Sequence, residues 1–374
     1  MRLVYKLGIV YGVAELIHQL MYWRRYIYFN SLRITHTESL SETWVMLKSL
    51  MNKNPQLFQR TGLFTHTENI KDEKDLYDVL TSHAEERPAN KLQVGCSRLH
   101  WRYCPFAFEL FMKTIRQFGN LYMKYIQRYE RTWHKTIDGY YSVWHHNVPG
   151  SKPLLFFPGL GLGAIPYAKF AKSFDRTVHI VEVPNIGYST PLSNSQVTPE
   201  SLYSVIKEHV DDGVDIFSHS FGSVTTAMYL NVIRDKPHPL QNVIICDGFT
   251  NPYDMINTHV YSFIDFSDYH NMNKKPRQWL EFAVLVFFGM HMVEFQAWAK
   301  RYHNIYTDIL WRDYPNTNIH YVYSKYDILY DTEYIAENSE CTLLPKGGHG
   351  YSVFGIRDIS IYKEMFRKNS ITFI

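Results

Sequence analysis

The sequence lacks the features that mark disulfide-rich, zinc-binding or glycosylated extracellular proteins. Its 374 residues contain four cysteines: Cys96, Cys104, Cys246 and Cys341. None of them forms a Cys-x-x-Cys pair or a cysteine–histidine spacing typical of a metal site. No Asn-x-Ser/Thr site occurs either. These absences favour a reducing, intracellular location.

A strong excess of one charge is also missing. The formal net charge is only +3, and no zinc-finger, RNP or basic-zipper pattern is present, so nucleic acid is not an expected partner. Hydrophobic residues make up 45% of the chain and charged residues 20%, the balance of a globular protein. The chain has no internal repeat and no low-complexity segment.

No uninterrupted apolar run long enough to cross a bilayer stands at the N-terminus. Apolar residues there recur at helical spacing, but Lys6, Glu15, His18 and Gln19 interrupt them, and no small-residue cleavage site follows. This predicted helix either docks on the protein's own body, which we favour, or makes peripheral contact with a membrane through its apolar and basic residues. Localisation is therefore expected to be intracellular, with membrane association as the alternative.

Two kinds of organisation divide the chain. Residues 1–130 are expected to form a helical extension, whereas residues 131–374 alternate short apolar strands with helices. Ile137-Asp138-Gly139 between two alternating runs predicts a hairpin turn, and a helix is expected near residues 167–174. Thr198 followed by Pro199 predicts the start of another helix. The alternation predicts an α/β fold with a mostly parallel sheet covered by helices on both faces. Residues 250–314, rich in aromatic side chains, break the alternation and are interpreted as a helical cap insertion.

A short apolar strand, a sharp turn and a helix surround Ser220. The sequence Ser218-His219-Ser220-Phe221-Gly222 is close to the G-x-S-x-G pattern of a nucleophile elbow. The turn requires small residues two positions before and after the nucleophile. Ser218 stands where glycine is usual, but it is still small. Ser220 is therefore the candidate nucleophile.

The glycine-rich segment that starts at Gly159 follows another predicted strand. Acyl transfer needs two backbone N–H groups aimed at the developing oxyanion. We expect one from Phe221, directly after the nucleophile, and one from Leu160, with Gly159 allowing close approach of the backbone. A phosphate-binding loop is the alternative, but the glycine spacing does not match G-x-G-x-x-G and no Gly-Lys-Ser/Thr follows.

The remaining candidates lie after later strands. Asp327 ends a predicted strand and is the preferred acid for orienting a histidine, with Asp247 at the end of an earlier strand as the alternative. His349 follows the last predicted strand in a glycine-rich loop, where it would act as the general base. The chain order is thus Ser220, Asp327, His349.

This order, with the elbow and the glycine-rich loop, resembles the α/β-hydrolase superfamily from about Thr132 onward. The resemblance implies an eight-stranded, mostly parallel sheet with a cap inserted after the sixth strand. It also implies a serine hydrolase that cleaves a carboxylic ester or related acyl bond of a small, apolar substrate, with no metal or organic cofactor. The alternatives are an acyltransferase on the same fold and an inactive, hydrolase-like binding or scaffold protein.

Overall fold

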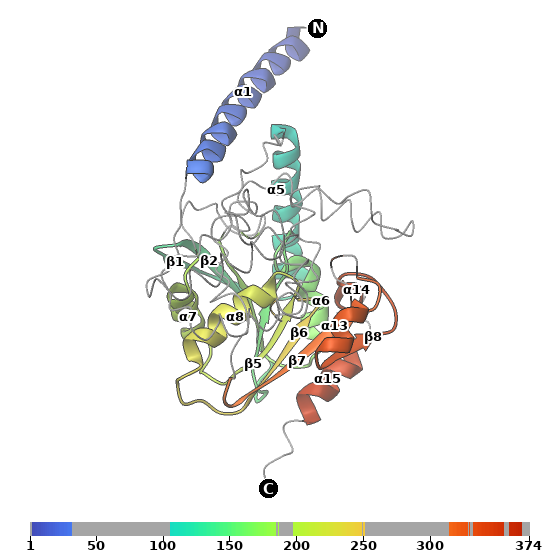
Figure 1. Cartoon of the computed structure of the whole chain (residues 1–374). Helices are drawn as coiled ribbons and strands as arrows, with labels where there is room; N and C mark the ends of the chain where they lie inside the picture. The colour runs from blue at the N-terminus through green and yellow to red at the C-terminus, as the bar shows by residue number, and fades with distance from the viewer. Residues whose placement is uncertain are drawn as a thin grey trace, which may run out of the picture.

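The computed structural model describes residues 2–31, 105–184, 186, 197–248, 250, 314–327, 329, 332–354 and 359–368. Its centre is one eight-stranded sheet with the strand order β1-β2-β4-β3-β5-β6-β7-β8 (Figure 1). The strands are β1 (Glu130–Thr136), β2 (Gly139–His146), β3 (Leu154–Phe157), β4 (Val178–Glu182), β5 (Asp215–His219), β6 (Gln241–Cys246), β7 (Thr317–Ser324) and β8 (Cys341–Leu344).

The direction of pairing changes once across the sheet. β1 and β2 form an antiparallel hairpin, and β2 pairs antiparallel with β4. From β4 through β3 to β8 every pair is parallel. The predicted, mostly parallel sheet is therefore confirmed. Since parallel strands end at the same edge, residues that follow β5, β6, β7 and β8 come together there.

Helices cover both faces of the sheet, because the central strands carry apolar side chains on both faces and each face must be shielded from water. One buried cluster joins the sheet to α7 (Pro199–Lys207) and α8 (Gly222–Ile233). The other joins it to α6 (Ala168–Lys172), α14 (Tyr351–Phe354) and α15 (Ile359–Lys368). Two short elements complete this part: the 3₁₀ turn η3 (Ile165–Tyr167) and α13 (Thr332–Asn338).

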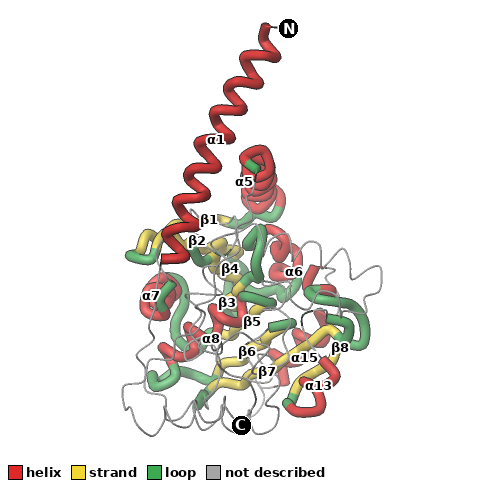
Figure 2. Tube along the Cα trace, turned by 45° about the horizontal axis from the view of Figure 1, so that its top comes forward, coloured by secondary structure: helices red, strands yellow, loops and turns green. Residues whose placement is uncertain are grey.

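Two helices stand outside the layered body. α1 (Arg2–Ser31) and α5 (Phe106–Leu121), which continues as the π-helix η2 (Tyr122–Ile126), lie at the same end of the molecule (Figures 1 and 2). They contact each other, since Glu15 accepts the N–H of Phe106 and His18 lies 3.2 Å from Glu109. Tyr22 and Tyr26 attach α1 to the core. None of the helices described is long and apolar enough to cross a membrane.

Local predictions were mostly correct, with two boundary errors. Gly139 already pairs with Thr136, so the hairpin turn holds only residues 137 and 138. The helix expected at 167–174 is a 3₁₀ turn followed by the short α6. Thr198 does cap α7, accepting the N–H of Ser201. The predicted cap at 250–314 lies outside the described residues except at its two ends, so the cap remains a prediction, as do the domain boundaries.

Candidate active site

Ser220 lies in the sharp turn between β5 and α8. Its φ of 52° is in the left-handed region, which costs free energy for a residue with a side chain. The neighbours show what holds the turn: the Ser220 N–H donates to the Cys246 carbonyl at 3.0 Å. A β-carbon at Gly222 would lie 2.1 Å from the Phe157 carbonyl oxygen, so only glycine fits. Ser218 is fully buried, which agrees with the need for a small side chain.

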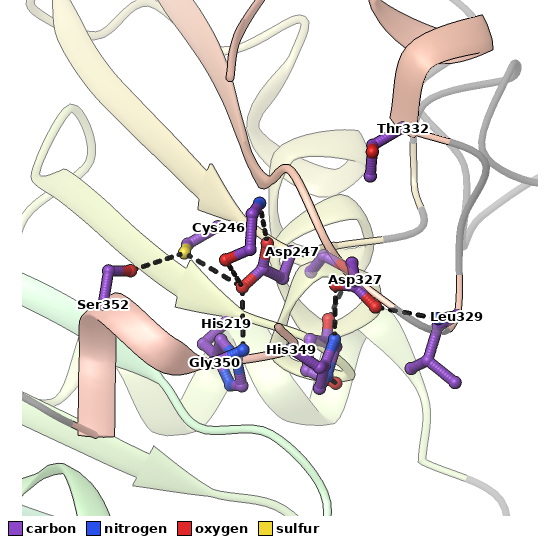
Figure 3. A network of polar contacts seen from close by, with 12 residues as sticks. His219, Cys246, Asp247, Asp327, Leu329, Thr332, His349, Gly350 and Ser352 are labelled. Carbon is purple, nitrogen blue, oxygen red and sulfur yellow. Dashed lines mark hydrogen bonds and ion pairs between the residues drawn. The ribbon is translucent and has the colours of Figure 1, made fainter. Parts of the chain in front are cut away.

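His349 and Asp327 meet Ser220 at this edge of the sheet. The His349 Nε2 atom lies 2.8 Å from the Ser220 Oγ atom, and its Nδ1 atom lies 2.8 Å from Asp327 Oδ2. Figure 3 shows His349 and Asp327 joined in this way. Asp327 is held by the Leu329 N–H, which donates to its other oxygen at 2.8 Å. The structure therefore brings together the three side chains proposed from the sequence, and all three are buried.

The protonation pattern of the histidine follows from its partners. A carboxylate can only accept, so His349 Nδ1 carries the proton that points at Asp327. Nε2 then accepts the Ser220 hydroxyl proton. The same hydrogen bond fixes the ring orientation.

Asp247, the alternative acid, has different partners. It follows β6 and accepts the N–H of Ser324 at 2.7 Å, the Ser324 hydroxyl at 3.0 Å and the N–H of Gly350 at 2.8 Å. Burial, and then the nearby Asp327 charge, raise the pKa of Asp247 to about 6. Its position makes it a clamp between the end of β7 and the loop that carries His349.

The loop after β3 lies against the elbow. A β-carbon on Gly159 would stand 3.1 Å from Ser220 Cβ and 2.8 Å from the Tyr167 hydroxyl, so any larger residue would have to displace that hydroxyl. Leu160, expected from the sequence to supply the second N–H donor, is the next residue along this loop. Phe221 stands at the N-terminus of α8, where helix N–H groups and the helix dipole favour negative charge.

A hydrogen-bond chain connects this loop to the residue before the nucleophile. The Gly159 N–H donates to the Tyr167 hydroxyl at 2.9 Å, and the same oxygen lies 2.9 Å from His219 Nδ1. The Tyr167 hydroxyl and His219 Nδ1 thus form one buried hydrogen bond. Burial lowers the pKa of His219 well below its usual value, so the ring is neutral. His219 is thus a support of the turn rather than a second base.

A second support, Glu182, was not identified from the sequence. This fully buried carboxylate accepts the N–H of Ala164 at 2.8 Å and pairs with Arg116 at 2.7 Å and Arg131 at 2.9 Å. Burial alone would raise its pKa, but the two arginines keep that pKa below the ordinary value. Through Ala164 and Arg116, Glu182 therefore fixes the far end of the loop after β3 and links that loop to α5. Only the position of Glu182 at the end of a strand was visible in the sequence.

One group among the described residues has the spacing of a metal site. Atoms of His219, Asp247 and His349 lie within 4.8 Å of one another, and all three residues are buried. Asp247 and His349 are already engaged by the hydrogen bonds described above, and Tyr167 holds His219. These bonds account for the cluster without an ion. The expectation that no metal or cofactor is needed remains a prediction.

The strand order, the strained serine turn after β5, and an acid and a histidine after β7 and β8 are the features of the α/β-hydrolase fold. The predicted fold class is therefore confirmed. No family model matches the sequence, and no curated protein matches it.

Several solved structures are similar to this chain at low identity. A membrane phospholipase A described as a bacterial virulence factor is 12% identical, with a TM-score of 0.48 over 70% of this chain and 94% of the other. A serine hydrolase from Cycloclasticus zankles is 11% identical, with a TM-score of 0.47 over 66% and 100%. Naproxen esterase from Bacillus subtilis is 12% identical, with a TM-score of 0.45 over 69% and 98%.

Proposed function

We propose that the protein is a serine hydrolase that cleaves a carboxylic ester or a related acyl bond. The observation that carries this proposal is the pair of 2.8 Å contacts that place His349 between Ser220 and Asp327. Such an arrangement makes a hydroxyl nucleophilic at neutral pH, because the base stands ready for its proton.

In the proposed reaction, Ser220 Oγ attacks the acyl carbon while its proton passes to His349 Nε2. The developing oxyanion is stabilised by the backbone N–H groups of Leu160 and Phe221, each contributing about 3–4 kcal/mol in the transition state. When the tetrahedral intermediate collapses, the bond to the leaving alcohol breaks and His349 protonates that alcohol. Water then attacks the acyl-enzyme, gives a proton to His349, and the acid leaves as Ser220 recovers its proton.

The test is covalent labelling by a fluorophosphonate probe. We expect the wild-type chain to be labelled and Ser220→Ala to lose labelling. Ser204→Ala serves as a control, since Ser204 is an exposed serine on α7. Labelling of Ser220→Ala at the wild-type level would remove Ser220 from its role. An unlabelled wild type that also hydrolyses no p-nitrophenyl ester would favour the non-catalytic binding protein.

The acyl acceptor and the acyl chain need separate measurements. A series of p-nitrophenyl esters of increasing chain length tests the expected preference for an apolar substrate. Product analysis with added alcohol distinguishes water from an alcohol as acceptor, and hence a hydrolase from an acyltransferase.

A further inference from the structure

The N-terminal helix α1 exposes a broad apolar face to solvent. Its exposed side chains Ile9, Val13, Leu16, Leu20, Trp23 and Ile27 recur at intervals of three and four residues, so they form one stripe along the helix. Each of them is 46–57% exposed. Val10 and Ile17 widen the stripe, at 66% and 54% exposed. A surface of this size on a folded chain marks an interaction site.

The opposite face of α1 is already used. Glu15 and His18 contact α5, while Tyr22 and Tyr26 are buried in the core. The helix is therefore fixed to the body on one side and leaves its apolar side outward. Figures 1 and 2 show α1 extending beyond the layered body at the end where α5 also lies.

α5 adds a second apolar surface at that end. Leu110, Phe111, Phe118 and Leu121 are 51–68% exposed. They lie across the helix from the buried Met112, Arg116 and Gly119. Tyr125 and Ile126 in η2 are exposed as well, at 65% and 66%.

We propose that these exposed faces of α1 and α5 form a docking surface for an anionic lipid bilayer. The exposed charged side chains described on α1 are Lys6 and Arg24, and both are basic. Both fall on the same side of the helix as the stripe, where long basic side chains extend to the headgroups while their stems stay among apolar groups. The acidic side chains nearby have partners on α5: Glu109 lies beside Lys113 and His18, and Glu15 accepts the N–H of Phe106.

A second copy of the chain fits this surface less well. Helices that pair in water usually match opposite charges beside the apolar seam. The stripe on α1 is flanked by Val10, Ile17 and Arg24, which offer no acidic partner. Trp23 and Tyr28, both exposed, are instead residue types enriched where a protein meets the headgroup region.

The test is flotation with lipid vesicles, performed on the full chain carrying Ser220→Ala. Because that chain cannot hydrolyse lipid by the proposed route, binding is measured independently of the proposed function. We expect binding to vesicles of phosphatidylcholine with phosphatidylserine, and weaker binding to phosphatidylcholine alone. The double change Leu16→Ser with Leu20→Ser should lower the partition coefficient at least about ten-fold. Arg24→Gln should remove much of the preference for phosphatidylserine, as should added salt.

Ile137→Ser is the matched control, since Ile137 is 88% exposed in the β1–β2 turn and belongs to neither helix. It should bind vesicles like its parent, and circular dichroism should show equal helix content in all variants. Equal binding by the Leu16/Leu20 double variant and its parent would overturn the proposal. So would a dimer in sedimentation velocity that this variant dissociates while no vesicle binding is seen, because the surface would then belong to a second copy.

Discussion

Two adjacent strands, β6 and β7, end in buried aspartates that do different work. Asp327 follows β7 and contacts the ring of His349, whereas Asp247 follows β6 and accepts backbone and hydroxyl protons from Ser324 and Gly350. Their side chains are close enough for the charge of Asp327 to raise the pKa of Asp247. The comparison teaches that a position at the end of a strand does not by itself assign a role to an aspartate. The role is set by the atoms that the carboxylate contacts.

The largest expected effect comes from changing the ring-bound aspartate. Asp327→Asn keeps an oxygen for the Leu329 N–H but presents an amide to His349, which favours the wrong histidine tautomer. We expect ester hydrolysis to fall about 10⁴-fold with little change in thermal unfolding. Steady-state kinetics and a melting curve measure both. If Asp247→Asn lost this much activity and Asp327→Asn did not, the two roles would be exchanged.

The second prediction concerns the charge of Asp247. Its folded-state pKa of about 6 lies above the ordinary value near 3.9, so the folded chain binds more protons than the unfolded chain between these values. Stability therefore falls as pH rises from 4 to 6, by up to about 3 kcal/mol from this group. Denaturant unfolding at several pH values should show this decline in the wild type relative to Asp247→Asn, which cannot titrate. Parallel curves for the two proteins would contradict it.

The third prediction is that changing Asp247 lowers kcat less than changing Asp327 does. In Asp247→Asn an NH₂ group replaces one of the two acceptor oxygens. This NH₂ group then faces the N–H of Gly350 or of Ser324, and the two donors repel each other. Since Gly350 follows His349, the base shifts slightly. We expect kcat to fall about ten-fold, far less than for Asp327→Asn. A hydrolysis rate equal to wild type would show that the clamp does not position His349.

The sequence was sufficient for the features that depend on neighbouring residues. Apolar runs broken by Gly and Pro predicted the strands, and small residues around Ser220 predicted its turn. Asp327 and His349 were found because each follows a strand and they occur in a known order. The expected contacts of Leu160 and Phe221 with an oxyanion remain predictions.

Other roles depend on contacts that sequence separation hides. Asp247 reaches Ser324 and Gly350 across 77 and 103 residues, and Glu182 meets Arg116 across 66. No local pattern distinguishes such a carboxylate from one at a turn. Tyr167, 52 residues before His219, was seen only as the start of a helix.

The smallest expected effect on activity comes from Tyr167, an uncharged residue that supports the nucleophile turn. Tyr167→Phe leaves the Gly159 N–H and His219 Nδ1 buried without their partner, which should cost about 1–3 kcal/mol of unfolding free energy and a few-fold in kcat. Tyr129→Phe is the matched control, because Tyr129 is also buried and its hydroxyl donates to the Ala168 carbonyl at 3.1 Å. Both variants should be destabilised, but only Tyr167→Phe should lose activity, since only its hydroxyl joins the loop after β3 to the nucleophile turn. Equal kinetic losses in the two would mean that Tyr167 acts through general stability.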